Sequence, residues 1–235
     1  MMLYLGTSGY SYKAWKGYFY PNDLPATKML EYYSRHFSSV EVNNTFYRMP
    51  KAEVVAAWRD TVPEGFRFVL KANMRLTHRQ RLKEAGETLA FMTRVFSAME
   101  GRLGAVLYQL PPNFKKDLAR LDGFLELLPE GTRAAFEFRH ATWFDEEVYA
   151  CLSKHRCALV VSDVDDEPAP SLEPLCDWGY LRLRRENYTP EDLDIWADRL
   201  KESGWKEIFC FFKHEEEGTG PRLAKDFESR FESDR

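Results

Sequence analysis

Residues 134–140 read AAFEFRH, from Ala134 to His140, and this short stretch carries the pattern on which the fold prediction rests. Apolar Phe136 and Phe138 alternate with charged Glu137 and Arg139, which is the two-residue period of a β-strand with two different faces. In a closed barrel, one face of each strand points inward and the other points toward the surrounding helices. We therefore predict that the two Phe side chains face helices and that Glu137 and Arg139 face the barrel interior.

Similar β-branched or aromatic runs recur along the whole chain, separated by segments with helical spacing. The predicted strands are Leu3–Thr7, Ser39–Val42, Arg67–Lys71, Ala105–Gln109, Ala134–Phe138, Ala158–Ser162, Tyr180–Arg184 and Glu207–Phe212. Parallel strands need connections of a dozen or more residues, which is the spacing seen here. The pattern predicts an α/β fold, a single (β/α)₈ barrel of the TIM type with eight parallel strands. An open doubly wound sheet is the alternative, but its G-x-G-x-x-G turn is absent.

The chain reads as one domain over residues 1–235, because no linker or low-complexity segment divides it. A length of 235 residues suits one such barrel, which commonly needs roughly 200 to 250 residues. Residues 163–177 read DVDDEPAPSLEPLCD, with three prolines and no apolar stripe. We therefore expect the sixth crossover to be irregular.

The composition of the chain limits which kinds of partner and which cellular location we expect. The net charge is −4, from 33 basic and 37 acidic residues, so a globally basic nucleic-acid binder is not indicated. No apolar run approaches the roughly 18 to 20 residues of a membrane span, and no export leader is visible. The four cysteines form no C-x-x-C pair and read as reduced core thiols. These features predict a cytoplasmic protein without a membrane partner.

Polar residues recur near the carboxyl ends of the predicted strands, where barrel enzymes keep their active sites. Alternation turns Glu41 and Asn43 inward in the second strand, and Arg182 inward in the seventh. Further polar side chains end other strands: Lys71, Gln109, Asp163 and the pair Lys213-His214, where alternation does not decide which one points inward.

At these residues the sequence resembles the YecE-like family, also called domain of unknown function 72, over essentially the whole chain. The matching segments are Gly6–Tyr12 with Trp15, Val40–Tyr47, Phe68–Ala72 with Thr77-His78, Gly104, Gln109–Phe114, Phe136–His140 with Trp143, and Tyr180–Arg182. The resemblance implies a TIM-type barrel and assigns no biochemical activity. Two departures, Arg184-Arg185 in place of a common His-Gly pair and Lys213-His214 in place of an Asn-rich turn, predict a subgroup with a more basic site.

The surplus of basic residues at the predicted barrel mouth favours an anionic small-molecule ligand, bearing phosphate or carboxylate, held by charge-assisted hydrogen bonds. We predict a metal-independent enzyme of hydrolase or lyase/isomerase type, with no metal and no cofactor. The predicted catalytic residues are Glu137, His140 and Glu41, with His78 as a second candidate for proton transfer. The predicted ligand-binding residues are Arg182, Arg139, Lys71, Asn43, Gln109, Asp163, Tyr10, Tyr47, Trp143 and Lys213.

Three other functions stay open at this point. A metal-dependent enzyme, like barrels that isomerise sugars or cut DNA, would use ligands among Glu41, Glu137, Asp163, His140 and His214. A glycoside hydrolase would use a pair of the same carboxylates. A non-catalytic nucleic-acid binding module would use the basic residues Arg75, Arg79, Arg81, Lys83, Arg184 and Arg185.

The surroundings of Glu137 and Arg182 distinguish two hypotheses, a ligand site and a structural plug that closes the barrel. Alternate strands of a barrel contribute to the same interior layer, so we expect these two side chains to approach each other. A plug would bury them as an ion pair. We expect instead a ligand site, in which water reaches both side chains.

Overall fold

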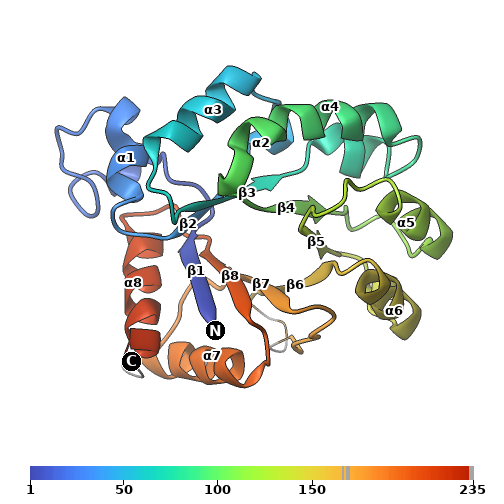
Figure 1. Ribbon diagram of the computed structural model, residues 1–235. Helices are drawn as coiled ribbons and strands as arrows, with labels where there is room; N and C mark the ends of the chain where they lie inside the picture. The colour runs from blue at the N-terminus through green and yellow to red at the C-terminus, as the bar shows by residue number, and fades with distance from the viewer. Residues whose placement is uncertain (166, 168–169, 233–235) are drawn as a thin grey trace.

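The computed structural model describes residues 1–165, 167 and 170–232, and these form eight parallel strands surrounded by helices (Figure 1). The strands are β1 (Met2–Thr7), β2 (Ser39–Val42), β3 (Arg67–Lys71), β4 (Leu103–Gln109), β5 (Ala134–Glu137), β6 (Ala158–Asp163), β7 (Trp178–Leu183) and β8 (Glu207–Phe212). The sheet order is β1-β8-β7-β6-β5-β4-β3-β2, so consecutive strands from β2 to β8 pair with each other and β8 pairs with β1, whereas β1 and β2 do not form a ladder. The predicted barrel class is confirmed.

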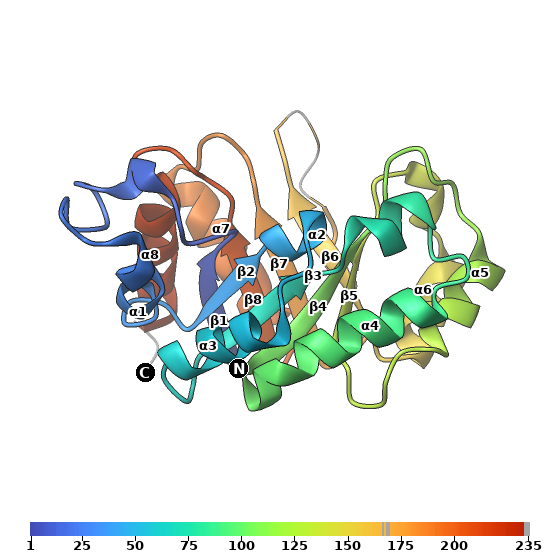
Figure 2. The same cartoon turned by 90° about the horizontal axis from the view of Figure 1, so that it is seen from above.

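Helices follow the strands around the outside of the barrel. The α-helices are α1 (Met29–Tyr33), α2 (Asn44–Tyr47), α3 (Ala52–Thr61), α4 (Gly86–Phe96), α5 (Leu118–Leu125), α6 (Glu146–Lys154), α7 (Pro190–Glu202) and α8 (Thr219–Glu232). Shorter helical segments are η1 (Lys13–Trp15), η2 (Ala26–Lys28), η3 (Arg75–Arg79), η4 (Ser97–Arg102) and η5 (Ala141–Trp143). Figure 2, a view turned by 90°, shows the strands from the side, with α2 at the end of β2. No helix among the described residues is long and apolar enough to cross a membrane.

The seam between β1 and β2 is closed mainly by side chains. One parallel bridge joins Ser8 to Glu41 beyond the end of β1. Before this bridge along the two strands, the Tyr33 hydroxyl accepts a hydrogen bond from Thr7 N at 2.8 Å and donates one to Ser39 O at 3.1 Å. The Ser38 hydroxyl likewise accepts from Leu5 N at 2.9 Å. These hydroxyls satisfy backbone groups that a regular ladder would otherwise pair.

Two apolar layers hold the barrel. The larger layer lies between the strands and the helices and includes Phe136, Phe138 and Trp196. The smaller one fills the interior and includes Tyr4, Tyr180 and Phe209. Along each strand the residues alternate between these layers, as the pattern at residues 134–140 predicted.

The sixth crossover is irregular, as predicted. Among residues 164, 165, 167 and 170–177, which the structure describes, no helix forms. Asp166, Pro168 and Ala169, on which part of that prediction falls, lie outside the described residues.

Helix α7 begins with a capping box, which gives a first test of the fold. The Thr189 hydroxyl accepts from Asp192 N at 3.2 Å, and the Asp192 carboxylate accepts from Thr189 N at 2.9 Å. Thr189→Ala should lower the free energy of unfolding by about 1 kcal/mol, because it leaves a first-turn N–H without its cap. Urea denaturation measures this, with the exposed Thr27→Ala variant as the control. An equal loss in both variants would show that the cap contributes nothing specific.

Candidate functional site

A buried ion network crosses the barrel interior near the carboxyl ends of the strands, and Arg182 on β7 is its centre. The Arg182 guanidinium donates to Glu137 Oε2 at 2.5 Å and to Glu41 Oε1 at 2.9 Å, so it bridges β5 and β2. Tyr180, two residues earlier on the same face of β7, donates its hydroxyl to Glu41 Oε2 at 2.7 Å. The predicted approach of Glu137 and Arg182 is confirmed.

Further side chains complete the hydrogen bonding of both carboxylates. Asn43 Nδ2 donates to Glu41 Oε1 at 2.9 Å, and Gln109 Nε2 donates to Glu137 Oε2 at 2.8 Å. Arg139 donates to Glu137 Oε1 through two nitrogens, both at 3.2 Å. Burial alone would raise the pKa of Glu137, but the charges of Arg182 and Arg139 outweigh it and lower that pKa to about 2. At Glu41, too, burial raises the pKa and the charge of Arg182 lowers it, and the net effect is a lowered pKa.

Burial overturns the expectation that water reaches the centre of this network. Only 2% of Arg182, 2% of Glu137 and none of Glu41 is exposed. The two acids are therefore buried partners of Arg182, and their lowered pKa values keep both ionised near neutral pH. Neither is placed to exchange protons with a ligand near neutral pH, because each carboxylate is ionised and already hydrogen-bonded.

Cations that do reach the surface lie around the buried centre. Arg139 is 36% exposed, and Arg184, whose guanidinium lies 3.5 Å from Glu137 Oε1, is 19% exposed. Lys213 at the end of β8 is also exposed. Burial and the neighbouring charge of Arg182 lower the pKa of Arg184, and burial and Arg184 lower that of Lys213. The shifts indicate that these cations are crowded together.

The charge balance at this end of the barrel is positive. The cationic side chains are Lys71, Arg139, Arg182, Arg184 and Lys213, and the buried carboxylates are Glu41 and Glu137. At the rim, exposed Glu215 adds one negative charge close enough to Lys213 to raise its pKa in part. The cluster therefore keeps an excess of about two positive charges when all its members are ionised, which favours anions.

Lys71, at the end of β3, occupies a distinctive position beside the network. Its amine donates to Gln109 Oε1 at 3.0 Å and lies 4.3 Å from the ring centre of Phe46. The His78 ring packs edge-on against the same Phe46 ring, with centroids 4.8 Å apart. Burial and the charge of Arg182 lower the pKa of Lys71 to about 8, and burial together with Lys71 lowers that of His78.

Several buried polar atoms in this region have no protein partner among the described residues. They are Asn43 Oδ1, Ser162 Oγ, Arg182 Nε and Arg184 Nε. Ser162 pairs in register with Arg182, so these atoms come from neighbouring strand ends. Buried polar groups normally have partners, so this concentration of unused donors and acceptors at one end of the barrel suits a polar ligand.

Asp163 belongs to a different cluster from the one predicted. Its carboxylate accepts from Trp196 Nε1 on α7 at 3.0 Å, from the Tyr188 hydroxyl at 2.9 Å and from Arg185 Nε at 2.9 Å. On β6 the interior positions are Ala158 and Val160, so Asp163 points toward the helices. The sequence reasoning missed this because residues 158–161 are all apolar and do not reveal which face is inside.

The structure also separates the remaining predicted site residues. Trp143 is fully buried, donates to Phe114 O at 2.6 Å and stacks on Phe138, so the structure places it in the apolar core outside the strands and apart from the ion network. Tyr10 is partly buried against the outer apolar layer, whereas Tyr47 is 74% exposed on α2. His140 hydrogen-bonds through its ring to Thr142 at the start of η5, and it makes no hydrogen bond to the described residues of the network.

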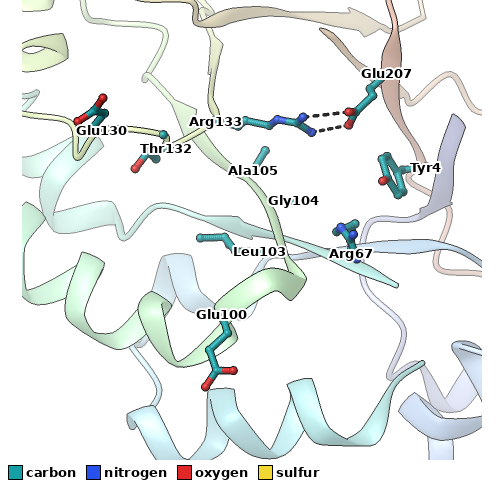
Figure 3. A pocket seen from close by; sticks show the side chains of 11 residues that line it. Tyr4, Arg67, Glu100, Leu103, Gly104, Ala105, Glu130, Thr132, Arg133 and Glu207 are labelled. Atoms are coloured by element: carbon teal, nitrogen blue, oxygen red, sulfur yellow. Dashed lines mark hydrogen bonds and ion pairs between the residues drawn. The ribbon is translucent and has the colours of Figure 1, made fainter. Parts of the chain in front are cut away.

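A cavity of about 420 Å³ lies at the opposite, amino-terminal end of the barrel (Figure 3). Arg133 and Glu207 line it side by side and form a two-point ion pair at 2.5 and 3.0 Å. Arg67 lies 5.8 Å from the ring centre of Tyr4. The cations here already have partners, and in TIM barrels this end contributes mainly to stability.

Metal-ligand geometry does not coincide with the ion network. Among the described residues, Asp122, Cys151 and His155 are the one group of at least three candidate ligands whose atoms lie within 4.8 Å of one another. Asp122 lies on α5, Cys151 lies on α6, and His155 is the residue that follows α6, so the group is outside the barrel. In the network, Arg182 is hydrogen-bonded to both Glu41 and Glu137, and a guanidinium in that position opposes a cation.

Comparisons with known proteins agree on one family. A family model described as "Protein of unknown function DUF72" matches residues 4–235. The UPF0759 protein YecE of Escherichia coli (strain K12) is 32% identical over 178 residues, and the UPF0759 protein YunF of Bacillus subtilis (strain 168) is 30% identical over 179 residues. The matches cover 74% and 71% of this chain, but only 62% and 61% of the two relatives.

A solved structure supports the same assignment. The crystal structure of a DUF72 family protein from Thermotoga maritima MSB8 superimposes with a TM-score of 0.83 at 28% sequence identity. The match covers 99% of this chain and 100% of that one. The fold described above is therefore shared over essentially the full length.

Proposed function

Because the chain belongs to the family described as "Protein of unknown function DUF72", its activity has to be inferred from the barrel mouth, and we propose that the mouth binds and processes a small anion. The ligand carries a phosphate or carboxylate group, and the protein acts on it without a metal ion, as a hydrolase or as a lyase or isomerase. The excess of positive charge around Arg139 and Arg184 is the observation that carries this proposal.

The roles within the site follow from burial. Arg139 and Arg184 are partly exposed and contact the ligand, whereas buried Glu137 pairs with both of them and is itself held by Arg182. A guanidinium already oriented by a carboxylate loses less freedom when it binds an anion. Among the histidines considered, we assign proton transfer to His78 rather than to His140, because His78 packs beside the aromatic ring that Lys71 contacts. Four free cysteines suit a cytoplasmic location for this enzyme.

Calorimetric titration with glycerol 3-phosphate and with inorganic phosphate tests anion binding. Arg139→Met and Arg184→Met should each weaken binding roughly 10- to 100-fold, because each removes a charge-assisted hydrogen bond of about 1.5 to 3 kcal/mol. Arg133→Met, at the opposite end of the barrel, removes the same charge and serves as the matched control. Uncharged glycerol should not bind.

Two results would contradict the proposal. Equal affinities in Arg139→Met and Arg133→Met would show that anions bind nonspecifically. Binding of a single-stranded oligonucleotide that falls steeply with salt, with no affinity for either small phosphate, would instead favour a nucleic-acid binding module. In that module the exposed Arg75 and Arg79 could contribute, whereas Arg185 is held by Asp163 and Asp192.

A further inference from the structure

Lys71 differs from the other cations at the barrel mouth in what surrounds its amine. The side chain is 9% exposed at the end of β3, and its position is fixed from the backbone because the Thr45 hydroxyl donates to Lys71 O at 2.6 Å. Among the described residues, no carboxylate lies within 4.0 Å of Lys71 Nζ. A lysine whose role was to neutralise an acid would have such a partner.

The groups that contact the Lys71 amine carry no charge. Gln109 turns its Nε2 toward Glu137, so its Oε1 faces Lys71 and accepts one N–H. The Phe46 ring is the other contact of the amine. Charged groups lie further away: Arg182 and Arg139 lower the pKa of Lys71, Glu41 and Glu137 raise it, and burial makes the net shift downward. A neutral amine keeps a lone pair that an ammonium lacks. Burial beside other cations is a known way of activating a lysine as a nucleophile.

We propose that Lys71 is a nucleophile that forms a Schiff base with an aldehyde or ketone which also carries a phosphate or carboxylate group. This inference rests on the proposed anion site, because Arg139 and Arg184 would hold the anionic group while the carbonyl carbon meets the amine. It narrows the substrate class to carbonyl-bearing anions and favours the lyase or isomerase reaction over hydrolysis.

The step balances without an oxidant or a reductant. The lone pair of the neutral Lys71 amine forms a bond to the carbonyl carbon, and the C=O π pair moves to oxygen, which takes up a proton. Loss of a proton from nitrogen gives a neutral carbinolamine. Protonation of its hydroxyl lets the C–O bond break and water leave, and the nitrogen lone pair forms the C=N bond of the iminium. His78, beside the same Phe46 ring, is placed to carry protons to and from the oxygen.

Reductive trapping tests the proposal directly. The full chain is incubated with pyruvate and sodium cyanoborohydride at pH 7.5, and the modified lysines are located by peptide mass spectrometry. With a pKa of about 8, roughly a quarter of Lys71 is neutral at this pH, against about 0.1% of an ordinary lysine. Lys71 should therefore be labelled at least about tenfold more than exposed Lys206, allowing for the lower nucleophilicity of a less basic amine.

Controls separate this inference from the anion site. Lys71→Arg should abolish the adduct, and Lys206→Arg should leave labelling of Lys71 unchanged. Labelling of Lys71 should rise with pH through about 8 and should be slowed by inorganic phosphate. Calorimetry with phosphate on the same preparation reports anion binding independently of trapping.

The possible results are distinct. Preferential labelling of Lys71 by pyruvate over uncharged acetone supports the inference. Phosphate binding without labelling of Lys71 above the level of Lys206 overturns the inference and leaves the anion site standing. Equal labelling of Lys71 by pyruvate and acetone, with no phosphate binding, overturns the anion site and with it the proposed substrate class.

Discussion

Replacing Arg182 by methionine should lower the free energy of unfolding by roughly 3 to 5 kcal/mol, because it removes one partner of a fully buried ion network. Glu41 and Glu137 would keep their charges inside the barrel without the guanidinium that joins them. Urea denaturation at pH 7 measures the loss. The control is Arg133→Met, whose ion pair with Glu207 is partly exposed and should contribute at most about 1 kcal/mol.

A second substitution shows whether the loss comes from uncompensated charge. Arg182→Met leaves two buried carboxylates, Glu41 and Glu137, without their main partner. Adding Glu137→Gln removes the charge of one of them. The double variant should therefore regain part of the lost stability, although a cavity and unused hydrogen-bond donors remain. Strictly additive losses from the two substitutions would show that no electrostatic coupling links the residues.

The barrel could be predicted because its signal is repeated. Eight apolar runs with helix-length spacers admit few parallel arrangements, and four residues of alternation at 136–139 fix which face of β5 is inside. Two strand beginnings were missed for one physical reason. The predicted strands began at Ala105 and Tyr180, just after glycines, whereas β4 begins at Leu103 and β7 at Trp178.

Those glycines are required by packing and do not interrupt the strands. A Cβ at Gly179 would lie 2.3 Å from Cε3 of Trp205, and one at Gly104 would lie 2.6 Å from Cε1 of Phe209. Each strand therefore gives up a side chain so that an aromatic ring can approach its backbone. Patterns of neighbouring residues do not reveal these contacts, because Trp205 and Phe209 are far along the chain from Gly179 and Gly104.

The sequence identified most residues of the ion network, but it predicted their arrangement only in part. Alternation correctly turned Glu41, Glu137 and Arg182 inward, and the expected approach of Glu137 to Arg182 is confirmed, but as a buried ion pair. How deep they lie follows from side chains of other strand ends that pack on them, such as Gln109, Arg139 and Arg184, and alternation along one strand does not encode that packing. Tyr180 was missed as a partner of Glu41, although its position two residues before Arg182 places it on the same face of β7.

The same burial predicts a strong acid sensitivity that depends on Glu137. Its pKa is about 2 in the folded protein against 4.5 for an ordinary glutamate, so the folded state favours the ionised form. A lowered pKa of this kind stabilises the protein above pH 4.5, and the contribution is lost as the pH falls toward 2. A shift of about 2.5 units at 1.36 kcal/mol per unit amounts to about 3 kcal/mol.

Urea denaturation between pH 6 and pH 2.5 should therefore show a steeper loss of stability in the wild-type protein than in Glu137→Gln. At pH 6 the variant is the less stable protein, because Arg182 and Arg139 have lost one carboxylate partner. As the pH falls the wild-type protein must protonate the same carboxylate, so the gap between the two should narrow by about 2.5 kcal/mol down to pH 2.5, which is still above the folded pKa. Glu64→Gln, an exposed change in the loop before β3, controls for the removal of an acid elsewhere and should follow the wild-type curve. Parallel curves for Glu137→Gln and the wild-type protein would mean that the ionised form of Glu137 is not favoured by folding, and the buried network would then lack the electrostatic role assigned to it.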